Sequence, residues 1–540
     1  MKTLFVAKKI ITMDASHPFA THIAVEDGKI VGLGDTELLD LFKDFQVDDQ
    51  FKEKIILPGF IEAHSHALAG QDGLIAYAGY FDRPSVDGTT LKGHTSVDSL
   101  IKYLQEEEKK LGPNDPLVAN GFDPIYFDGV RVNKTDLDKV STNRIVMLLH
   151  ASGHLMTINS FAVSKIPADK LSTQGVAKGQ DGSPNGELQE ITAMLLGFAL
   201  VGAQFAKLID PKVVIPGYMA LAKRAGCTTV GEMGGVFELD DPAVVDEVIA
   251  LMQQSPVRMV PAYFVSTSTK KPEEMPDYVK SLVAKSTDRV RFGSVKMVAD
   301  GSLQGFTGRV TQPYLNGTQN GLWNQDPETL KKFALLFHTA RIQMNCHCNG
   351  DEASAAFITA VKEAEASHPW PDNRHVVQHA QLVDEPQFLA IKALGMGANI
   401  FANHLYYWGD QHRDKILGPE RANRMDAVNT ALSLGVPFSL HSDANITPIA
   451  PLFNAWCAVN RLTATGKVLG EKEKISVEDA LYAMTQGAAY LLKLEKEIGS
   501  VTIGKIADFV VLEKDPYAED PKKLKDIKVI TTVSGGTVNT

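Results

Sequence analysis

The stretch that decides the fold is Pro58-Gly-Phe-Ile-Glu-Ala-His64-Ser-His66, in which an apolar run follows a Pro-Gly turn and ends at two histidines. Residues i and i+2 of a strand point to the same side, so His64 and His66 leave the strand together. Two imidazoles on one face can bind one divalent ion. The stretch therefore predicts a strand over Ile55–His64 whose end carries two metal ligands.

Seven further short runs, rich in β-branched residues, follow along the chain and alternate with amphipathic stretches of helical period. The predicted strands are Thr228–Glu232, Arg258–Phe264, Arg291–Met297, Ile342–His347, Val376–His379, Gly397–Phe401 and Pro437–His441. The predicted helices between them include Lys212–Ala225, Ala243–Gln254, Pro327–Ala340 and Glu352–Ser367. Eight strands with intervening helices favour an α/β fold, a distorted (β/α)8 TIM barrel. A doubly wound open sheet is the alternative, although no glycine-rich phosphate loop follows a strand.

The two ends of the chain and one long connection interrupt this rhythm. Strands one and two are separated by roughly 160 residues, far more than an ordinary connection. We therefore expect an insertion at about 70–215, on the barrel face where active sites lie, as a lid or substrate wall. Short strands between turns over 1–57 and 480–540 predict one small β-sandwich domain built from both termini. The barrel then spans 58–479.

The composition excludes several classes of protein. With 540 residues, 44% of them hydrophobic and 22% charged, the chain is neither disordered, collagen-like nor a disulfide scaffold. The net charge of −11 disfavours nucleic-acid and anionic-membrane partners. Four scattered cysteines indicate a reducing compartment. Without a signal peptide or a run of ~18 apolar residues, we expect a soluble, cytoplasmic protein.

Further candidate ligands stand at the ends of other predicted strands. His347 ends strand five, His379 ends strand six and Asp443 follows strand eight. Taken singly, each is more often a structural or surface residue. Because the carboxyl ends of barrel strands meet at one face, four histidines and a carboxylate there predict a metal centre for a hydrolase.

Lys296, near the end of strand four, leaves two interpretations open. An ammonium group with a pKa of ~10.4 is no metal ligand at neutral pH. Its neutral amine could add carbon dioxide and form a carbamate that bridges two metals. The alternative is a salt bridge from Lys296 to Asp300.

The ordered motifs resemble the amidohydrolase superfamily, in the family 3 branch that includes N-substituted formamide deformylases. The resemblance covers nearly the whole chain. Besides the opening stretch it rests on Ala24-Val-Glu-Asp-Gly-Lys-Ile-Val, Lys296-Met-Val-Ala-Asp-Gly-Ser, His347-Cys-Asn-Gly-Asp, Gln378-His-Ala-Gln, Ser442-Asp-Ala and Gly499-Ser-Val-Thr-Ile-Gly-Lys-Ile-Ala-Asp-Phe-Val-Val-Leu.

The resemblance implies a binuclear centre of two divalent ions, usually Zn²⁺. His64 and His66 would hold the more buried ion, and His347 and His379 the more exposed one. Lys296, carboxylated by CO2, would bridge them, and Asp443 would bind metal and carry the proton of the attacking hydroxide. The partner expected is a small-molecule substrate, and a homodimer is in keeping with the family.

Several residues depart from the family pattern or lie beside its motifs. His441 stands where a small residue is common and shares a face with Asp443, so it either enters the site or shapes its floor. Cys348 follows the strand-five histidine, and we favour packed thiols for it and Cys346. In the insertion, His154 is a candidate substrate or transition-state contact and Asn159 lies nearby; the alternative is internal hydrogen bonding. After strand seven, a pocket lining or a solvated loop is predicted for Asn403, His404, Tyr407, Trp408, His412 and Arg413.

The function predicted is hydrolysis of an amide-like carbon–nitrogen bond, other than a peptide bond, by a metal-activated hydroxide. Asp443 would transfer the proton and His154 would stabilise the oxyanion. A deaminase or esterase using the same centre is an alternative. A non-catalytic metal-binding or regulatory protein on a hydrolase fold is another.

Overall fold

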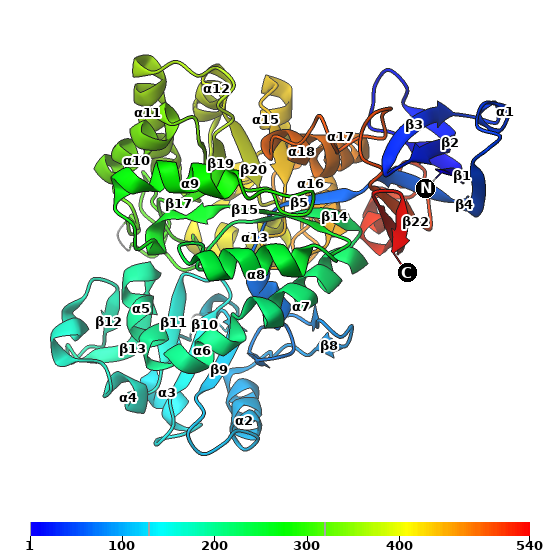
Figure 1. The fold of residues 1–540 in the computed structure, drawn as a ribbon. Helices are drawn as coiled ribbons and strands as arrows, with labels where there is room; N and C mark the ends of the chain where they lie inside the picture. The colour runs from blue at the N-terminus through cyan, green and yellow to red at the C-terminus, as the bar shows by residue number, and fades with distance from the viewer. Residues whose placement is uncertain (1, 128–129, 318–319, 540) are drawn as a thin grey trace.

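Parallel strands form the centre of the molecule, for which a computed structural model describes residues 2–127, 130–317 and 320–539 (Figure 1). A parallel bridge between Ser65 and Ala444 joins the first strand to the end of the last, so the strands close into a barrel. Ala262 alone separates two pieces of the third strand. In order the strands are β5 (Phe60–Ser65), β14 (Cys227–Glu232), β15 (Arg258–Pro261) with β16 (Tyr263–Phe264), β17 (Ser294–Val298), β18 (Gln343–Cys348), β19 (Val376–His379), β20 (Gly397–Ile400) and β21 (Phe438–Leu440).

The first predicted strand, Ile55–His64, is wrong at its start. Residues up to Pro58 belong to β4 (Gln46–Pro58) of a different sheet, and β5 begins at Phe60. Gly59 separates the two strands where the backbone passes against β14, and a Cβ atom there would overlap the Thr228 side chain. A continuous apolar run therefore hides a change of sheet at one glycine.

Helices cover the outside of the barrel. Asp210 caps α7 by accepting from Lys212 N, and Pro211 takes the first helical position, where its missing N–H costs nothing. The four predicted helices agree with the structure within two residues at each end. The covering helices are α7 (Pro211–Arg224), α8 (Pro242–Met252), α9 (Met275–Val283), α10 (Pro327–Thr339), α11 (Asp351–Ser367), α12 (Glu385–Ala393), α13 (Asn403–Gln411), α15 (Val428–Leu434), α16 (Pro451–Asn460), α17 (Val477–Tyr482) and α18 (Ala488–Leu491).

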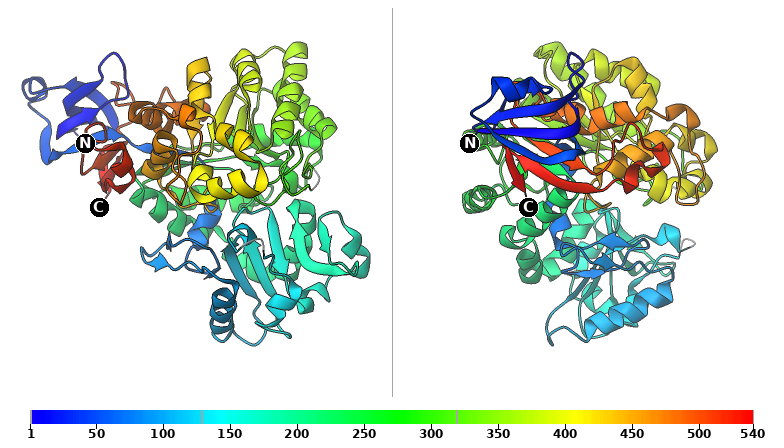
Figure 2. Two further views of the ribbon diagram at one scale, coloured as in Figure 1. Left: turned by 180° about the vertical axis from the view of Figure 1, so that it is seen from behind. Right: turned by 90° about the vertical axis from the view of Figure 1, so that its right-hand side faces the viewer.

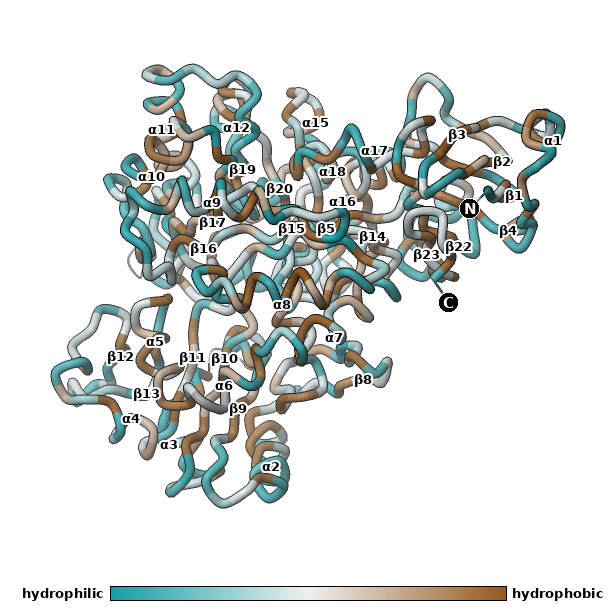
Figure 3. The backbone as a smooth tube through the Cα atoms, viewed as in Figure 1, coloured by the Kyte–Doolittle hydropathy of each residue, from teal (hydrophilic) through white to brown (hydrophobic). Residues whose placement is uncertain are grey.

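The main apolar core lies between the barrel strands and these helices. Val295 and Met297 of β17 pack there with Phe337 of α10 and Phe357 of α11, all buried. Burial of one such side chain contributes about 1.5–3 kcal/mol. Since alternate strand residues face this core, the other residues of each strand face the barrel interior. In Figure 3 the apolar colour of α8 marks part of this packing layer.

Residues 76–127 and 130–208 form a lobe with a six-stranded sheet of its own below the barrel in Figure 1. Its range lies within the predicted insertion. One face packs on α2 (Val97–Glu108) and α3 (Lys134–Asp138), the other on α4 (Ser160–Val163) and α5 (Glu190–Leu200). In sheet order its strands are β12 (Val176–Lys178), β13 (Pro184–Gln189), β11 (Leu155–Ile158), β10 (Val146–His150), β9 (Leu117–Phe122) and β6 (Ala76–Tyr77).

Both chain ends contribute to one seven-stranded sheet, seen from two sides in Figure 2. The two-sheet sandwich expected from the sequence is here a single hydrogen-bonded sheet. It curves until Lys29 of β3 bridges Ile506, which precedes β22, and an apolar cluster fills the concave side. In order its strands are β24 (Thr537–Asn539), β23 (Val529–Ser534), β22 (Phe509–Leu512), β4, β1 (Lys2–Ile11), β2 (Phe19–Glu26) and β3 (Lys29–Gly34).

The predicted domain boundary at residue 480 falls inside barrel-covering helices. Ala488 and Ala489 of α18 pack with Ile61 and Ala63 of β5, and the terminal sheet resumes only at β22. Helical packing on the barrel therefore extends past the predicted boundary. Among the described residues, no helix combines the length and apolar character needed to cross a membrane.

Candidate metal centre

Three side chains at one end of the barrel place donor atoms around a common point. His64 and His66 stand at the end of β5, and Asp443 follows β21. Asp443 Oδ1 lies 3.3 Å from His64 Nε2 and 3.2 Å from His66 Nε2. Donors about 2.0–2.2 Å from a tetrahedral zinc ion lie roughly 3.3 Å from one another. The spacing of this group therefore suits a bound metal ion.

A second group of possible ligands shares His64 with the first. Ligand atoms of His64, His379 and His441 all lie within 4.8 Å of one another, and all three side chains are buried. The His64 and His379 rings are 4.7 Å apart, and the His64 and His441 rings stack at 4.8 Å. The structure thus brings together His64, His66, His379 and Asp443 of the predicted ligands and adds His441.

Two buried atoms in these groups have no hydrogen-bond partner within the described part of the chain: His379 Nε2 and Asp443 Oδ1. A buried polar atom without a partner costs about 1–3 kcal/mol, so such atoms call for an explanation. A nitrogen lone pair and a carboxylate oxygen both bind divalent ions. The burial and the chemistry of these two atoms therefore fit a bound metal ion.

The electrostatics favour the protonation states that metal ligands need. Burial, with Lys296 nearby, lowers the pKa of His64 to about 4. Burial and the neighbouring His347 hold the pKa of His379 well below its usual value. Burial opposes ionisation of Asp443, but its interactions with His64 and His379 outweigh that effect and hold its pKa well below the ordinary range. Two neutral imidazoles and an ionised carboxylate result at neutral pH.

Backbone strain accompanies two of these residues. His379 has φ of 69° and Asp443 has φ of 51°, both in the left-handed region that favours glycine. Alternation along β19 would point His379 away from its neighbour Gln378, yet the turn in the chain brings both toward the site. Strain of this kind persists where the surrounding structure fixes it, commonly at functional sites.

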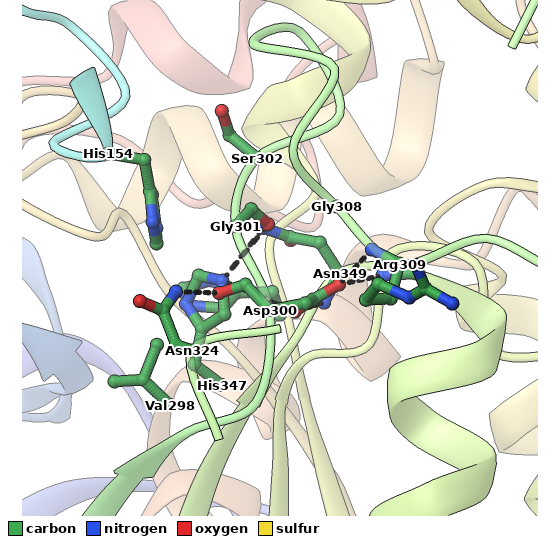
Figure 4. Close-up of polar contacts among 12 residues, drawn as sticks. His154, Val298, Asp300, Gly301, Ser302, Gly308, Arg309, Asn324, His347 and Asn349 are labelled. Carbon is green, nitrogen blue, oxygen red and sulfur yellow. Dashed lines mark hydrogen bonds and ion pairs between the residues drawn. The ribbon is translucent and has the colours of Figure 1, made fainter. Parts of the chain in front are cut away.

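Lys296 lies on β17 and faces the same interior. Its Nζ is 3.2 Å from His64 Nε2, and burial lowers its pKa to about 8. Asp300, the partner in the salt-bridge alternative, instead accepts hydrogen bonds from the backbone N–H groups of Arg309, Asn349 and Gly350 (Figure 4). Within the described ranges, no ion pair joins Lys296 to Asp300.

His347 lies beside the two groups rather than within them. Its ring is 4.4 Å from that of His379, while its Nε2 lies 3.3 Å from the Gly301 carbonyl oxygen and 3.1 Å from Asn349 Nδ2. Figure 4 shows the imidazole beneath this loop. The rings of His347 and His379 are therefore neighbours, but among the described residues His347 belongs to neither group of clustered ligand atoms.

His154 reaches the site from the insertion lobe. Its ring is 4.7 Å from that of His347, and its Nδ1 lies 2.8 Å from Glu190 Oε2, which also accepts from Asn324 Nδ2 at 2.6 Å. Burial lowers the pKa of His154, but the Glu190 carboxylate outweighs that effect and the net shift is upward. Asn159, by contrast, caps α4 and holds the backbone of the lobe, which is the structural alternative.

Glu190 is the functional candidate that sequence reasoning missed. It follows β13 with φ of 64°, and its Oε1 is buried without a partner in the described residues. Its carboxylate meets His154 across 36 positions of sequence, a pairing that no local motif signals. Only the register of the lobe sheet, in which Leu155 pairs with Gln189, brings the two together.

A sequence model described as "Amidohydrolase family" matches residues 52–539. The chain belongs to the amidohydrolase family. It is 27% identical to the YtcJ amidohydrolase of Bacillus subtilis (strain 168), over 100% of this chain and 99% of that protein. It is 22% identical to the N-substituted formamide deformylase of Arthrobacter pascens, over 99% and 97% of the two chains.

The fold of this amidohydrolase has solved counterparts. An uncharacterized metal-dependent hydrolase from Pyrococcus horikoshii OT3 superposes with a TM-score of 0.71 at 17% identity, covering 96% of this chain and 99% of that one. At this identity the likeness shows the fold, which is TIM-barrel-like. Family membership together with the clustered ligand atoms supports a metal-dependent hydrolase.

A small cavity of about 40 Å³ opens between the lobe and the barrel of this amidohydrolase. Tyr407 and Trp408 of α13 line it, as one of the two interpretations of that segment predicted. Asn403, His404 and His412 are buried away from the lining, and Arg413 pairs with Asp414. The remaining lining is Tyr77, Tyr80, Phe81, Asp82, Arg83, Gly121, Tyr126, Ala151, Asn445, Ile446 and Pro448.

The two thiols beside His347 belong to the apolar core. Cys346 and Cys348 are buried among the barrel-covering helices and form no disulfide. Burial holds the pKa of the Cys348 thiol well above its usual value, which disfavours the thiolate that binds metals. The packing expected for these cysteines is what the structure has.

Proposed function

We propose that this amidohydrolase cleaves an amide-like carbon–nitrogen bond of a small molecule with the help of two divalent ions, Zn²⁺ by the type of ligand. The observation that carries the proposal is the group His64, His66 and Asp443, whose donor atoms all lie within 4.8 Å of one another. His347 and His379 would hold the second ion. Imidazole and carboxylate donors are the usual ligands of catalytic zinc.

Divalent ions at this place would supply Lewis acidity, which lowers the pKa of water and polarises a carbonyl group. The remaining steps belong to the chain. Asp443, held ionised, accepts the proton of the attacking water and passes it to the leaving nitrogen. His154, whose Nδ1 is fixed by Glu190, presents its other ring nitrogen to the developing oxyanion.

We propose that Lys296, as a carbamate, would bridge the two ions when they are bound. The neutral amine attacks carbon dioxide, an N–C bond forms, and solvent water takes the proton that leaves the nitrogen, so the product is an anion with two oxygen ligands. Burial lowers the Lys296 pKa to about 8, compared with ~10.4 for an exposed lysine, so the neutral amine is more available. Its place 3.2 Å from His64 Nε2 supports the role.

Metal content is the first test. Protein purified without chelator should contain close to two transition-metal ions per chain by mass spectrometry, and reloading with zinc and bicarbonate should restore any shortfall. A content near one ion per chain would contradict the carbamate bridge. Protein that stays metal-free after reloading would contradict the proposed function altogether.

Activity is then assayed with amides, cyclic amides, esters and aminopurines. The amide classes should turn over fastest, and Asp443→Asn should keep most of its metal while losing at least about 100-fold in kcat, because the amide cannot take the proton. Full activity of Asp443→Asn would remove the proton-transfer role. Preference for an ester or an aminopurine would replace the carbon–nitrogen hydrolase by the esterase or deaminase alternative.

A further inference from the structure

We infer that His441 is a positioning residue: held by Asn399, it fixes the tautomer of His379 so that His379 Nε2 presents its lone pair to the metal site. The inference rests on the proposed function, since it assigns the metal-facing nitrogen of one proposed ligand. It concerns hydrogen bonds that exist in the protein before any metal binds. Its tests therefore include one that needs no metal.

A row of polar side chains crosses the barrel interior beneath the proposed ligands. Gln378, Asn399 and Ser439 are register neighbours on the parallel strands β19, β20 and β21, so they point to the same side. All three are buried. His441 follows Ser439 by two positions and stands one layer nearer the site. An apolar barrel interior would need none of these groups, and each of them has a specific partner.

The hydrogen bonds of this row can be oriented from Gln378. Its Nε2 donates to Asn345 Oδ1 at 2.8 Å, so its Oε1 faces the other way and can only accept. His64 Nδ1, 2.6 Å from that oxygen, therefore carries its hydrogen, and a neutral His64 presents a lone pair on Nε2, 3.2 Å from Lys296 Nζ.

The same reasoning shows which nitrogen of His379 carries the hydrogen. Gln378 Oε1 also accepts from Asn399 Nδ2 at 2.9 Å, so the Asn399 oxygen faces the other way. That oxygen accepts from Ser439 Oγ at 2.7 Å and from His441 Nδ1 at 3.0 Å. His441 Nε2 is then an acceptor, and it lies 3.2 Å from His379 Nδ1. His379 donates there and keeps its lone pair on Nε2.

The buried Nε2 of His379 has no hydrogen-bond partner among the described residues, whereas Nδ1 lies 3.7 Å from Asp443 Oδ2. A lone pair on Nε2 is therefore available to a cation. If His441 were instead a metal ligand, its Nε2 could no longer accept from His379 Nδ1. His379 would then bind through Nδ1 and leave a buried N–H group on Nε2 without an acceptor, which is the costlier arrangement. The geometry therefore favours positioning over ligation.

The first test reads the tautomers directly. Protein labelled with ¹⁵N-histidine and freed of metal gives two-bond ¹H–¹⁵N correlations that distinguish the two tautomers of a neutral imidazole. Signals are assigned by their loss in His379→Gln and His441→Gln. We expect hydrogen on Nδ1 of both His379 and His441. Hydrogen on Nε2 of either residue would overturn the inference, whether or not the protein binds metal.

The second test uses two carboxamide substitutions as a matched pair. His441→Gln can place its carbonyl oxygen where Nε2 was, so it keeps an acceptor for His379. His441→Asn reaches only to the Nδ1 position, so it keeps the contact with Asn399 and loses that acceptor. Zinc affinity is measured by competition with a chelator, and thermal unfolding of the metal-free variants checks that both are folded.

Loss of a ligand's supporting partner typically lowers metal affinity by about 10–100-fold. We expect a loss of that size for His441→Asn and a change of less than about 3-fold for His441→Gln. An equal large loss in both variants would make His441 a ligand and overturn the positioning role. Wild-type affinity in His441→Asn would overturn it as well. A wild-type protein that binds no zinc but shows the expected tautomers would contradict the proposed function alone.

Discussion

Single residues at this site act in pairs, and His154 with Glu190 is the pair with the clearest chemistry. The carboxylate of Glu190 accepts from His154 and from Asn324, so it both orients the imidazole and raises its pKa. An imidazole oriented in this way can hold a proton toward an oxyanion. The role of His154 therefore depends on a residue that lies in another part of the lobe.

Glu190→Gln tests this dependence, because the amide keeps the shape of the side chain and removes its charge. We expect kcat to fall by about 100-fold, while KM and metal content change little. Asn324→Ala, which removes the other partner of the carboxylate, should cost less, since His154 keeps its charged acceptor. Steady-state kinetics with metal analysis give the answer. A wild-type kcat for Glu190→Gln would contradict the proposed role of His154 in the reaction.

At this scale the sequence predicted which side chains gather at the site better than it predicted their hydrogen-bond partners. The gathering of His64, His66, His379 and Asp443 could be predicted because the barrel rule places strand ends together. Glu190 and Asn399 could not, since a carboxylate or carboxamide has no signature until its hydrogen-bond partner is known. His441 was recognised as a departure from the family pattern that shares a face with Asp443, but its contacts with Asn399 and His379 were not predicted.

Among the elements, the junction of β4 and β5 shows that one continuous apolar run can contain strands of two different sheets. Both strands are apolar and β-branched at their junction, so their period does not change. The change of sheet depends on a close approach of Gly59 to Thr228. Helices were predicted within two residues from their apolar period, and the structure adds caps such as Asp210 at their starts.

Gly59→Ala should destabilise the protein by about 1–3 kcal/mol, because the added Cβ atom overlaps a buried β-branched side chain on a rigid strand. The readout is the midpoint of thermal unfolding at a fixed scan rate. Gly202→Ala is the control, since a Cβ at that position meets nothing within 4 Å. An equal midpoint for Gly59→Ala and wild type would mean that β5 can shift away from β14.

The lobe sheet contains an ion pair that gives it a defined response to acid. Arg131 donates to Glu187 through Nε at 2.8 Å and Nη2 at 2.6 Å. Burial raises the pKa of Glu187, but the hydrogen bonds and charge of Arg131 outweigh it, so the net shift is downward. Glu187 therefore contributes stability above its unfolded pKa of ~4.3, and this is lost as the pH falls through the lower folded value.

Glu187→Gln should consequently lower the unfolding midpoint at pH 7 and weaken its dependence on pH below ~4.3. Thermal unfolding followed at a series of pH values measures both effects. Glu106→Gln serves as the control, because the Glu106–Lys109 pair is exposed and contributes little. Parallel curves for Glu187→Gln and wild type below pH ~4.3 would show that this carboxylate is not the group that titrates.

In the whole molecule, the cavity between lobe and barrel joins two parts that the sequence predicted separately. Phe81 comes from the insertion and Tyr407 from α13, and their rings meet at 5.2 Å. Phe81 and Tyr407 form one wall of the cavity. Arg83 of the lobe connects this wall to the segment after Asp443 by donating from Nη2 to the Asn445 carbonyl oxygen at 2.9 Å. An insertion could be predicted from its length, but its docking surface depends on packing across some 300 residues of chain, which no local pattern records.

If this wall contacts substrate, Phe81→Ala and Tyr407→Ala should each change kcat/KM for any one substrate by about 10–200-fold, with metal content unchanged. Because the two rings touch, the double variant should deviate from the sum of the single effects. Phe161→Ala is the matched control, since Phe161 lies in the same lobe and outside the cavity lining. Additive effects, or a Phe161→Ala effect of equal size, would show that the lobe acts through its stability. Coupled effects confined to Phe81 and Tyr407 would mean that lobe and barrel select the substrate as one surface.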